Sequence, residues 1–138
     1  MKTIFAGLVL AVWVSGCASV QPEGLVSREL VKSTRSWDGA TLPAYPQGQP
    51  EITILRILIP AGTRLPTHYH PVINAGVLLS GELTVKTTDG KTLLLKAGDP
   101  IVEIVRTMHY GVNLGKTPAE ILVFYAGVES MPITQHEP

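Results

Sequence analysis

The strongest constraint on this chain is that its apolar residues come in short runs, each the length of one β-strand. Residues 51–59 read EITILRILI, and residues 82–87 alternate polar and apolar as a half-buried strand does. Turn residues end the runs, and Asp89-Gly90 is a strong hairpin signal. About seven or eight short strands with regular turns predict an all-β sandwich or barrel. The clearest strands are expected at residues 51–59, 72–79, 82–87, 92–96, 101–105, 109–113 and 120–126.

Composition predicts a single folded domain that does not bind nucleic acid. The chain has 138 residues, of which 45% are hydrophobic and 16% are charged, a balance that suits one packed core and not a disordered chain. Eleven Lys and Arg residues balance eleven Asp and Glu residues. No net field therefore attracts nucleic acid or an anionic membrane. The single cysteine, Cys17, excludes an internal disulfide.

Residues 1–17 have the pattern of a signal peptide. Lys2 precedes an apolar run at residues 4–14, which is shorter than the roughly 20 residues of a membrane-spanning helix. The run ends in the sequence VSGC, which resembles a bacterial lipobox whose cysteine is Cys17. The alternative is an ordinary cleavable signal peptide in which the cysteine occurs by chance. In both cases the domain is expected to work outside the cytoplasm.

The lipobox resemblance implies a lipid anchor on Cys17. In bacterial lipoproteins this cysteine becomes the first residue of the mature protein and carries a diacyl group, with palmitate-type chains. Two or more acyl chains hold a protein stably at a membrane. Ala18 follows the cysteine, and a residue other than Asp there implies transfer to the outer membrane. We therefore expect a lipid-anchored protein of the cell envelope, on the periplasmic face of the outer membrane.

Between the signal and the strands lies a segment rich in small residues and proline. Residues 25–37 have apolar spacing that would suit a short helix, but their Thr, Ser and Val content favours an edge strand, which we expect. Residues 42–50 contain three prolines and predict an extended arm. We divide the chain into a signal peptide (1–17), a tether and N-terminal arm (18–50), a barrel (51–127) and a C-terminal tail (128–138).

Three histidines are placed as metal ligands would be. His68 and His70 are two residues apart, so their side chains point to the same face of a strand. His109 lies on a later strand that can fold back beside them. Imidazole nitrogen suits Fe, Mn, Ni, Cu or Zn. The alternative is a metal-free barrel in which the histidines only form hydrogen bonds. His136, near the end of the chain, is expected to be solvated.

The spacing of these histidines from nearby glycines and asparagines resembles a known family. One motif runs from Gly62 through His68-x-His70 to Asn74 and Gly81, and a second runs from Gly98 to His109 and Asn113. These resemble the cupin signatures G-x5-H-x-H-x3,4-E-x6-G and G-x5-P-x-G-x2-H-x3-N. The resemblance covers residues 51–127. It implies a small single-domain cupin, an all-β double-stranded β-helix barrel, with a divalent transition metal (Fe, Mn, Ni or Zn) and a small-molecule ligand. It also allows a homodimer.

The sequence departs from the cupin signatures at two places. Ile104 and Arg106 replace a proline and a glycine without changing the histidine spacing. Asn74 replaces the family's glutamate ligand, at a position that shares strand parity with the histidines. Asn74 can be a weak ligand, a contact to ligand or substrate, or a packing residue. With three neutral imidazoles the divalent charge stays uncompensated, so we expect weaker metal binding and a preference for an anionic chelating ligand.

Other side chains near the motifs are candidates for secondary roles. Glu103 shares strand parity with His109 and can be a general acid or base if buried, or else a surface strand carboxylate or a structural partner. Tyr69, Tyr110 and Arg106 can line the mouth of the site and hold an anion, although packing for Tyr69 and solvation for Arg106 are the simpler interpretations. Trp37 can cap the barrel or pack the arm against it.

Three functions remain open from the sequence. The first is a metal-dependent envelope enzyme acting on a small anionic oxygen-bearing molecule, with dioxygenase or isomerase chemistry. The second is a module that binds a small ligand or a metal without turnover. The third is an interaction protein that has kept the barrel and lost its chemistry, against which the three histidines argue.

Overall fold

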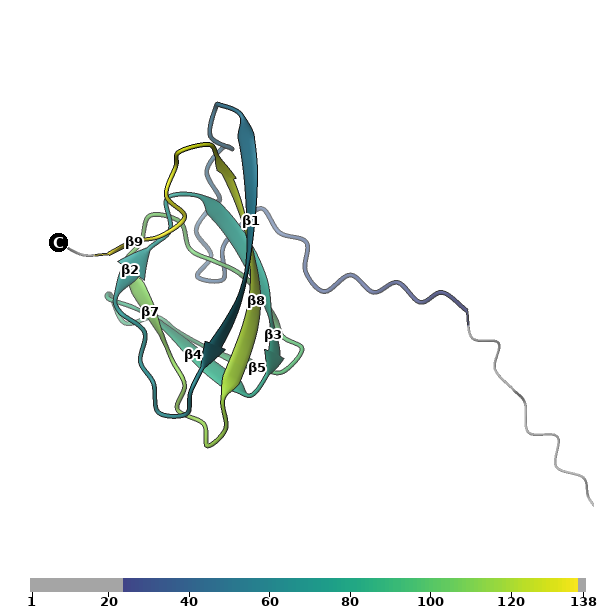
Figure 1. Cartoon of the computed structure of the whole chain (residues 1–138), viewed down its shortest axis with the longest axis vertical. Coiled ribbons are helices and arrows are strands. Elements are labelled where there is room, and N and C mark those ends of the chain that lie inside the picture. The colour runs from purple at the N-terminus through teal and green to yellow at the C-terminus, as the bar shows by residue number, and fades with distance from the viewer. Residues whose placement is uncertain (1–23, 137–138) are drawn as a thin grey trace, which may run out of the picture.

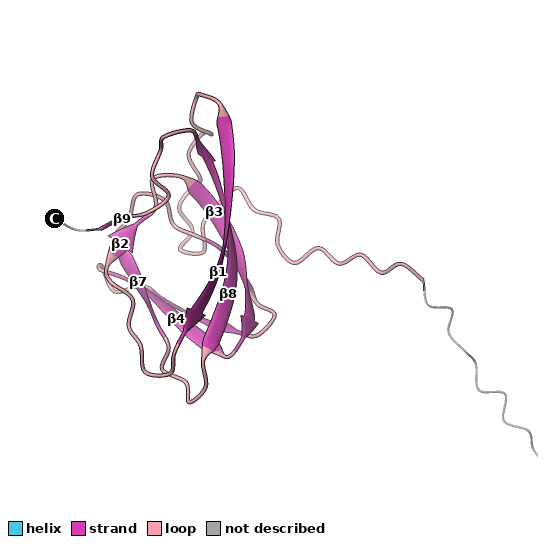
Figure 2. Cartoon of the chain, viewed as in Figure 1, coloured by secondary structure: helices cyan, strands magenta, loops and turns pink. Residues whose placement is uncertain are grey.

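The computed structural model describes residues 24–136, and these form two antiparallel β-sheets that face each other (Figures 1 and 2). The signal peptide and Cys17 lie outside the described residues. One sheet has the order β1-β8-β3-β6, and the other has the order β5-β4-β7-β2-β9. The strands are β1 (Pro50–Ile59), β2 (His68–Tyr69), β3 (Ile73–Ser80), β4 (Glu82–Thr87), β5 (Thr92–Lys96), β6 (Pro100–Val102), β7 (His109–Val112), β8 (Ala119–Val128) and β9 (Gln135–His136).

The sheet order is that of a jelly roll. Strands far apart in the sequence pair with each other, most extensively β1 with β8, from Pro50↔Val128 to Ile59↔Ala119. The expected all-β double-stranded β-helix is confirmed in this form. The sheets do not close into one hydrogen-bonded cylinder, because the strand order of the described residues ends at β1 and β6 in one sheet and at β5 and β9 in the other. No helix of the described chain is long and apolar enough to cross a membrane.

The core lies between the two sheets and follows the period of two in the sequence. On β8 the side chains of Ile121, Val123 and Tyr125 are buried, whereas Phe124 on the outer face is 44% exposed. The hairpin predicted at Asp89-Gly90 joins β4 to β5, and Gly90 adopts a φ of 95° that favours glycine. Alternation therefore predicted which residues face the interior.

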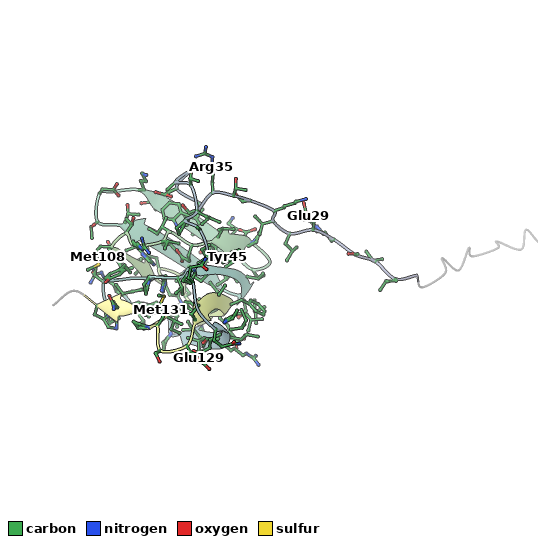
Figure 3. All side chains as sticks on the ribbon, turned by 90° about the horizontal axis from the view of Figure 1, so that it is seen from above. Glu29, Arg35, Tyr45, Met108, Glu129 and Met131 are labelled. Carbon is green, nitrogen blue, oxygen red and sulfur yellow. The ribbon has the colours of Figure 1, made fainter. Side chains whose placement is uncertain are left out.

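The prediction of an edge strand at residues 25–37 is wrong. The only pairing there is an isolated bridge between Arg35 and Thr41, and a strand needs a neighbouring ladder to satisfy its backbone. Leu30 and Val31 instead lie half exposed over the outer face of β3. Figure 3 shows this arm from above, with Glu29 and Arg35 labelled along it.

The end of the arm is attached to the sheets around Trp37. The Trp37 side chain packs against the core, and its backbone N–H donates to the Val102 carbonyl at 2.9 Å. The neighbouring Asp38 carboxylate pairs with Lys91 Nζ at 2.9 Å. Trp37 thus packs the arm onto the jelly roll, as one of the two sequence interpretations proposed.

The strand expected at residues 101–105 ends early. β6 stops at Val102, and the chain then turns at Arg106, whose φ is 61°. A positive φ is strained for a residue other than glycine, and the Arg106 N–H donates to the His70 carbonyl at 2.8 Å. This turn returns the chain toward β7 and so brings His109 beside His68 and His70.

Candidate metal centre

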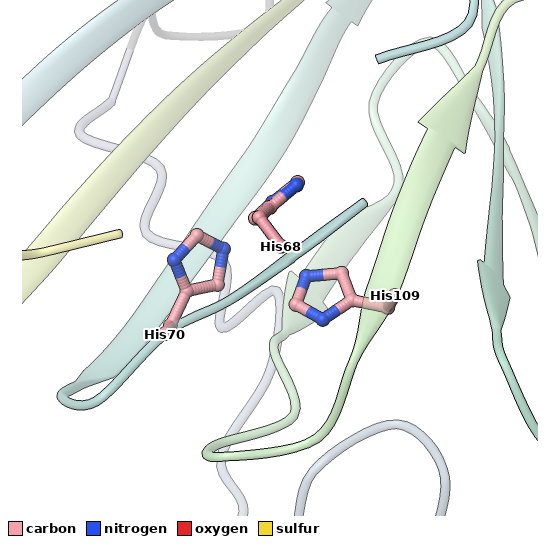
Figure 4. A group of neighbouring side chains, drawn as sticks. All are labelled: His68, His70 and His109. Atoms are coloured by element: carbon pink, nitrogen blue, oxygen red, sulfur yellow. The ribbon is translucent and has the colours of Figure 1, made fainter. Parts of the chain in front are cut away.

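The three predicted histidines converge between the sheets (Figure 4). His68 on β2 pairs in register with His109 at the start of β7, and His70 follows directly after β2. Their potential donor nitrogens all lie within 4.8 Å of one another. The ring centroids are 4.9 Å apart for His68 and His70, 4.6 Å for His68 and His109, and 5.0 Å for His70 and His109. The three histidines that the sequence singled out therefore lie together in the structure.

A backbone carbonyl fixes the tautomer of each imidazole. The Nδ1 atoms of His68, His70 and His109 lie 2.7, 2.9 and 2.8 Å from the carbonyls of Pro66, Ile133 and Thr107. A carbonyl only accepts, so each Nδ1 carries the proton and each Nε2 keeps a free lone pair. Metal-binding histidines in proteins are commonly held in this way.

Burial keeps the three imidazoles neutral. Desolvation lowers the pKa of His70 to about 3, against the opposing effect of the Ile133 carbonyl. Desolvation likewise lowers the pKa of His68 and His109, again against their carbonyl partners. Neutral imidazole is the form that binds a metal. All three ligands are therefore in the binding form at neutral pH without having to lose a proton.

Asn74 lies close to the histidines, between the sheets, and its side-chain oxygen has no hydrogen-bond partner among the described residues. Its side chain is 1% exposed, and its Oδ1 atom is buried without a hydrogen-bond partner in the described structure. The Nε2 atom of His109 is buried and unpartnered as well. A buried acceptor without a partner costs free energy, and a metal ion or a bound molecule would satisfy both atoms. The donor set thus fits a divalent transition metal bound by three nitrogens.

Glu103 is buried beside the histidines, so the surface interpretation of this residue is wrong. It is 9% exposed, and its Oε2 atom lies 3.8 Å from His109 Nε2. Desolvation raises the pKa of its carboxyl from 4.5 to about 7, while the Ile104 N–H and the Trp37 indole favour the ionised form. The indole Nε1 makes no hydrogen bond of standard geometry in the described structure. Glu103 can therefore hold or release a proton near neutral pH.

The histidines line a cavity between the sheets that is partly open to solvent and has a volume of about 230 Å³. Its polar lining comes from the three histidines, Asn74 and Glu103, together with three residues that the sequence analysis did not assign to the site. Most of the remaining lining is aliphatic, from both sheets. These other residues are Leu55, Ile57, Ile59, Leu65, Pro66, Leu83, Val85, Gly111, Ile121 and Val123.

These three residues are Tyr125, Thr134 and His136, of which His136 is exposed, as expected, at the edge of the cavity. Burial, and then the Glu103 charge, raise the pKa of Tyr125 to about 12, so its phenol stays protonated. The inward parity of residues 121, 123 and 125 could have found Tyr125. Thr134 Oγ1 lies 3.2 Å from His70 Nδ1, and His136 pairs with His68 through β9. No local pattern predicts these contacts, because they depend on the C-terminal segment folding back over β2.

Three residues expected at the mouth do not line the cavity. The Tyr69 hydroxyl donates to Gln135, and the Tyr110 ring carries the Arg64 guanidinium 3.9 Å above its centroid. Arg106 is exposed in the turn after β6. Their side chains are therefore used in packing or in solvent and not in holding an anion at the site.

Comparison with known proteins places the chain in a family. The cupin domain family matches residues 55–125, half of the chain, and the protein belongs to it. An oxalate oxidase in complex with the substrate analogue glycolate shares 26% sequence identity at a TM-score of 0.53, covering 61% of this chain and 45% of that chain. The alignment thus spans less than half of that protein. No curated protein matches the chain.

Two more distant structures share the fold. The DMSP lyase DddQ from Ruegeria pomeroyi shares 21% identity at a TM-score of 0.54, covering 62% of this chain and 42% of that chain. An oxalate decarboxylase from Lactobacillus farciminis in a formate complex shares 21% identity at a TM-score of 0.53, covering 62% of this chain and 26% of that chain. Likeness at this level supports the jelly roll alone.

The histidine geometry predicts one metal ion per chain. After loading with Fe, Mn, Ni or Zn and purification without a polyhistidine tag, elemental analysis should find about one ion per chain. His68→Ala and His109→Ala should each lose the ion, because each variant keeps only two of the three ligand nitrogens. His136→Ala is the matched control and should retain the ion. A wild-type protein that retains none of the four metals would contradict the prediction.

Because Asn74 stands where the cupin signature has a glutamate, we expect that a carboxylate at this position will strengthen metal binding. Asn74→Glu should tighten Zn²⁺ binding by about tenfold or more, because it adds a negative charge and a carboxylate donor beside the ion. Asn74→Gln has the size of glutamate without its charge and should give no such gain. Titration against a competing chelator measures both constants. Equal constants for the two variants would show that residue 74 does not reach the metal.

Proposed function

We propose that this protein is a metal-dependent enzyme of the cell envelope that acts on a small anionic, oxygen-bearing molecule. The single observation that carries the proposal is the pairing of two features in one cavity. Three neutral histidine nitrogens converge there without a carboxylate ligand, and a buried carboxyl, Glu103, lies 3.8 Å from His109. The three histidines can bind a metal ion, and the Glu103 carboxyl can transfer a proton.

Charge favours an anionic ligand at this site. His68, His70 and His109 are neutral, so they leave the charge of a divalent ion uncompensated. A ligand with two oxygen donors and a negative charge, such as an enolate, catecholate or carboxylate, supplies what the protein omits. When bound, a divalent transition metal supplies Lewis-acid polarisation of such oxygens and, if redox-active, reaction with dioxygen. The imidazole rings are fixed by their hydrogen bonds to backbone carbonyls, so they would hold the metal ion in one position for the ligand.

Glu103 is the group proposed to handle the proton. Its carboxyl lies in the same cavity as the histidines and is shielded from bulk water. A buried carboxyl placed beside an oxygen-bearing ligand can accept a proton from carbon or oxygen and return it elsewhere, which is the step that isomerisation and many oxygenations require. Tyr125, with its phenol protonated, lines the same cavity and can donate a hydrogen bond to the ligand.

The comparison with the oxalate oxidase supports this class of ligand. That protein is described in complex with the substrate analogue glycolate and shares 26% identity with this chain over 61% of its length. Glycolate has a carboxylate and a neighbouring hydroxyl, so it is small, anionic and rich in oxygen donors. A module that binds such a ligand without turnover is the alternative, and it is favoured by the mostly aliphatic lining of the cavity.

The lipid anchor and the dimer belong to the same proposal. The lipobox-like sequence before Cys17 supports attachment to the outer membrane on its periplasmic face. The homodimer stays a prediction. β1 is an edge strand with Ile52, Ile54 and Leu58 more than half exposed on its outer face, and such an edge can pair with a second copy.

Glu103→Gln should retain the metal and lose turnover. We expect a fall of about 10²- to 10⁴-fold, the usual contribution of a general acid or base. Oxygen uptake with diketones or catechols measures oxygenation, and exchange of the diketone C–H with D₂O measures proton abstraction. Glu82→Gln removes an exposed carboxylate and serves as the control. If wild type shows neither reaction but the ligands raise its melting temperature, the binding module is the better description.

Cys17→Ser should release the protein from the membrane. Without the thiol no diacyl group can be attached, so the chain should move from the membrane fraction to the soluble fraction. Fractionation followed by immunoblotting measures the change. A variant that stays in the membrane fraction with its signal removed would show that the attachment does not depend on Cys17.

A further inference from the structure

We propose that the ligand of this site is a monoanionic chelator with an apolar tail, and that a tail ending in a second carboxylate is excluded. The inference rests on the proposed function and names its ligand class. The chelating head lies at the histidines, and the tail lies in the aliphatic part of the same cavity.

Strand register separates the cavity into a polar layer and an apolar layer. On β8, Tyr125 pairs with Asn74 of β3, at the level of the site. Two residues back along β8, Val123 pairs with Leu55 of β1, and two further back, Ile121 pairs with Ile57. Each such step moves about 7 Å along the strand. The interior therefore changes from polar to aliphatic within one step.

The opposite sheet shows the same change. His109 of β7 pairs with Thr87 of β4, and two residues further along β7, Gly111 pairs with Val85. Val85 and Gly111 both line the cavity. A Cβ on Gly111 would lie 3.3 Å from both Leu65 Cδ1 and Leu83 Cδ1, so the two leucines pack closely against the glycine and form the apolar layer there. Both sheets thus contribute an aliphatic wall on one side of the histidines.

The described lining of the cavity contains no lysine or arginine, and its single carboxylate is Glu103. A second carboxylate on the tail would lie in the aliphatic layer without a cation. An unpaired charge in such a place costs several kcal/mol. Arg64 and Arg106 are exposed and outside the lining. An apolar tail meets no such penalty and gains from leaving water.

The space suits a tail of modest size. The cavity has a volume of about 230 Å³, and an aliphatic cavity of about 150 Å³ is enough to bind benzene. A two-oxygen chelating head together with one aryl ring or a chain of a few carbons therefore fits. Oxalate-sized ligands would fill only the polar layer and leave the aliphatic layer without a contact.

A series of hydroxamates with one chelating head tests the tail directly. The Zn²⁺-loaded full-length protein is titrated by calorimetry with acetohydroxamate, butyrohydroxamate, hexanohydroxamate and benzohydroxamate. Affinity should rise by roughly fourfold for each methylene that enters the cavity. Pentanohydroxamate is then compared with the monohydroxamate of glutaric acid, which has the same chain length and a terminal carboxylate. The charged tail should weaken binding by about 100-fold or more.

A pair of variants on β8 locates the tail. Val123→Phe places a ring in the aliphatic layer and should abolish the gain from longer tails while leaving acetohydroxamate binding within about twofold. Leu122→Phe, on the outer face of the same strand, is the matched control and should leave the whole series unchanged. If Val123→Phe fails to fold, the wild-type series alone still decides the matter.

The outcomes distinguish this inference from the function on which it rests. Elemental analysis before and after titration reports the metal. If no Zn²⁺ is retained, the metal centre itself fails. If Zn²⁺ is retained but affinity is independent of tail length, or the carboxylate-ended tail binds as well as its uncharged partner, only the ligand class is overturned.

Discussion

The pairing of β8 with strands on both of its sides is the constraint on which the rest of the molecule depends. β8 lies between β1 and β3, and its register fixes which residues of all three strands share a level. Because side chains alternate between faces, a slip of one residue would move Tyr125 and Val123 to the outside. The polar layer at Asn74 and the aliphatic layer behind it are both consequences of this one register.

The sequence was most informative where residues of one kind, apolar or histidine, recur at a fixed spacing. Alternation found β4 and β5 with their hairpin, and the period of two placed His68 and His70 on one face. His109 was placed beside them as a residue of a later strand that could fold back, and the family resemblance then supported the set. These succeed because strand parity is a local property, readable from neighbouring residues. The strand expected at residues 25–37 failed because strand formation also needs a partner ladder, which local composition does not reveal.

The residues that could not be predicted are those that depend on contacts between distant segments. Glu103 is buried beside the Trp37 side chain, which the arm packs against the core. The hydrogen bond from His70 Nδ1 to the Ile133 carbonyl depends on the C-terminal segment crossing β2. The arm and the C-terminal segment are thus part of the site's support, although the motifs lie entirely between them.

Asn74 and Glu103 are best understood together, through the charge of the whole site. With Asn74 in place of a carboxylate, the protein donates no charge through a direct ligand, but it keeps one carboxyl 3.8 Å from His109 Nε2. A divalent ion, an ionised Glu103 and a monoanionic ligand sum to neutrality, which a cavity with low dielectric strongly favours. A dianionic ligand would leave an excess negative charge unless Glu103 took up a proton. When Glu103 is ionised, charge neutrality therefore favours a ligand with one negative charge, in keeping with a described cavity lining that contains no lysine or arginine.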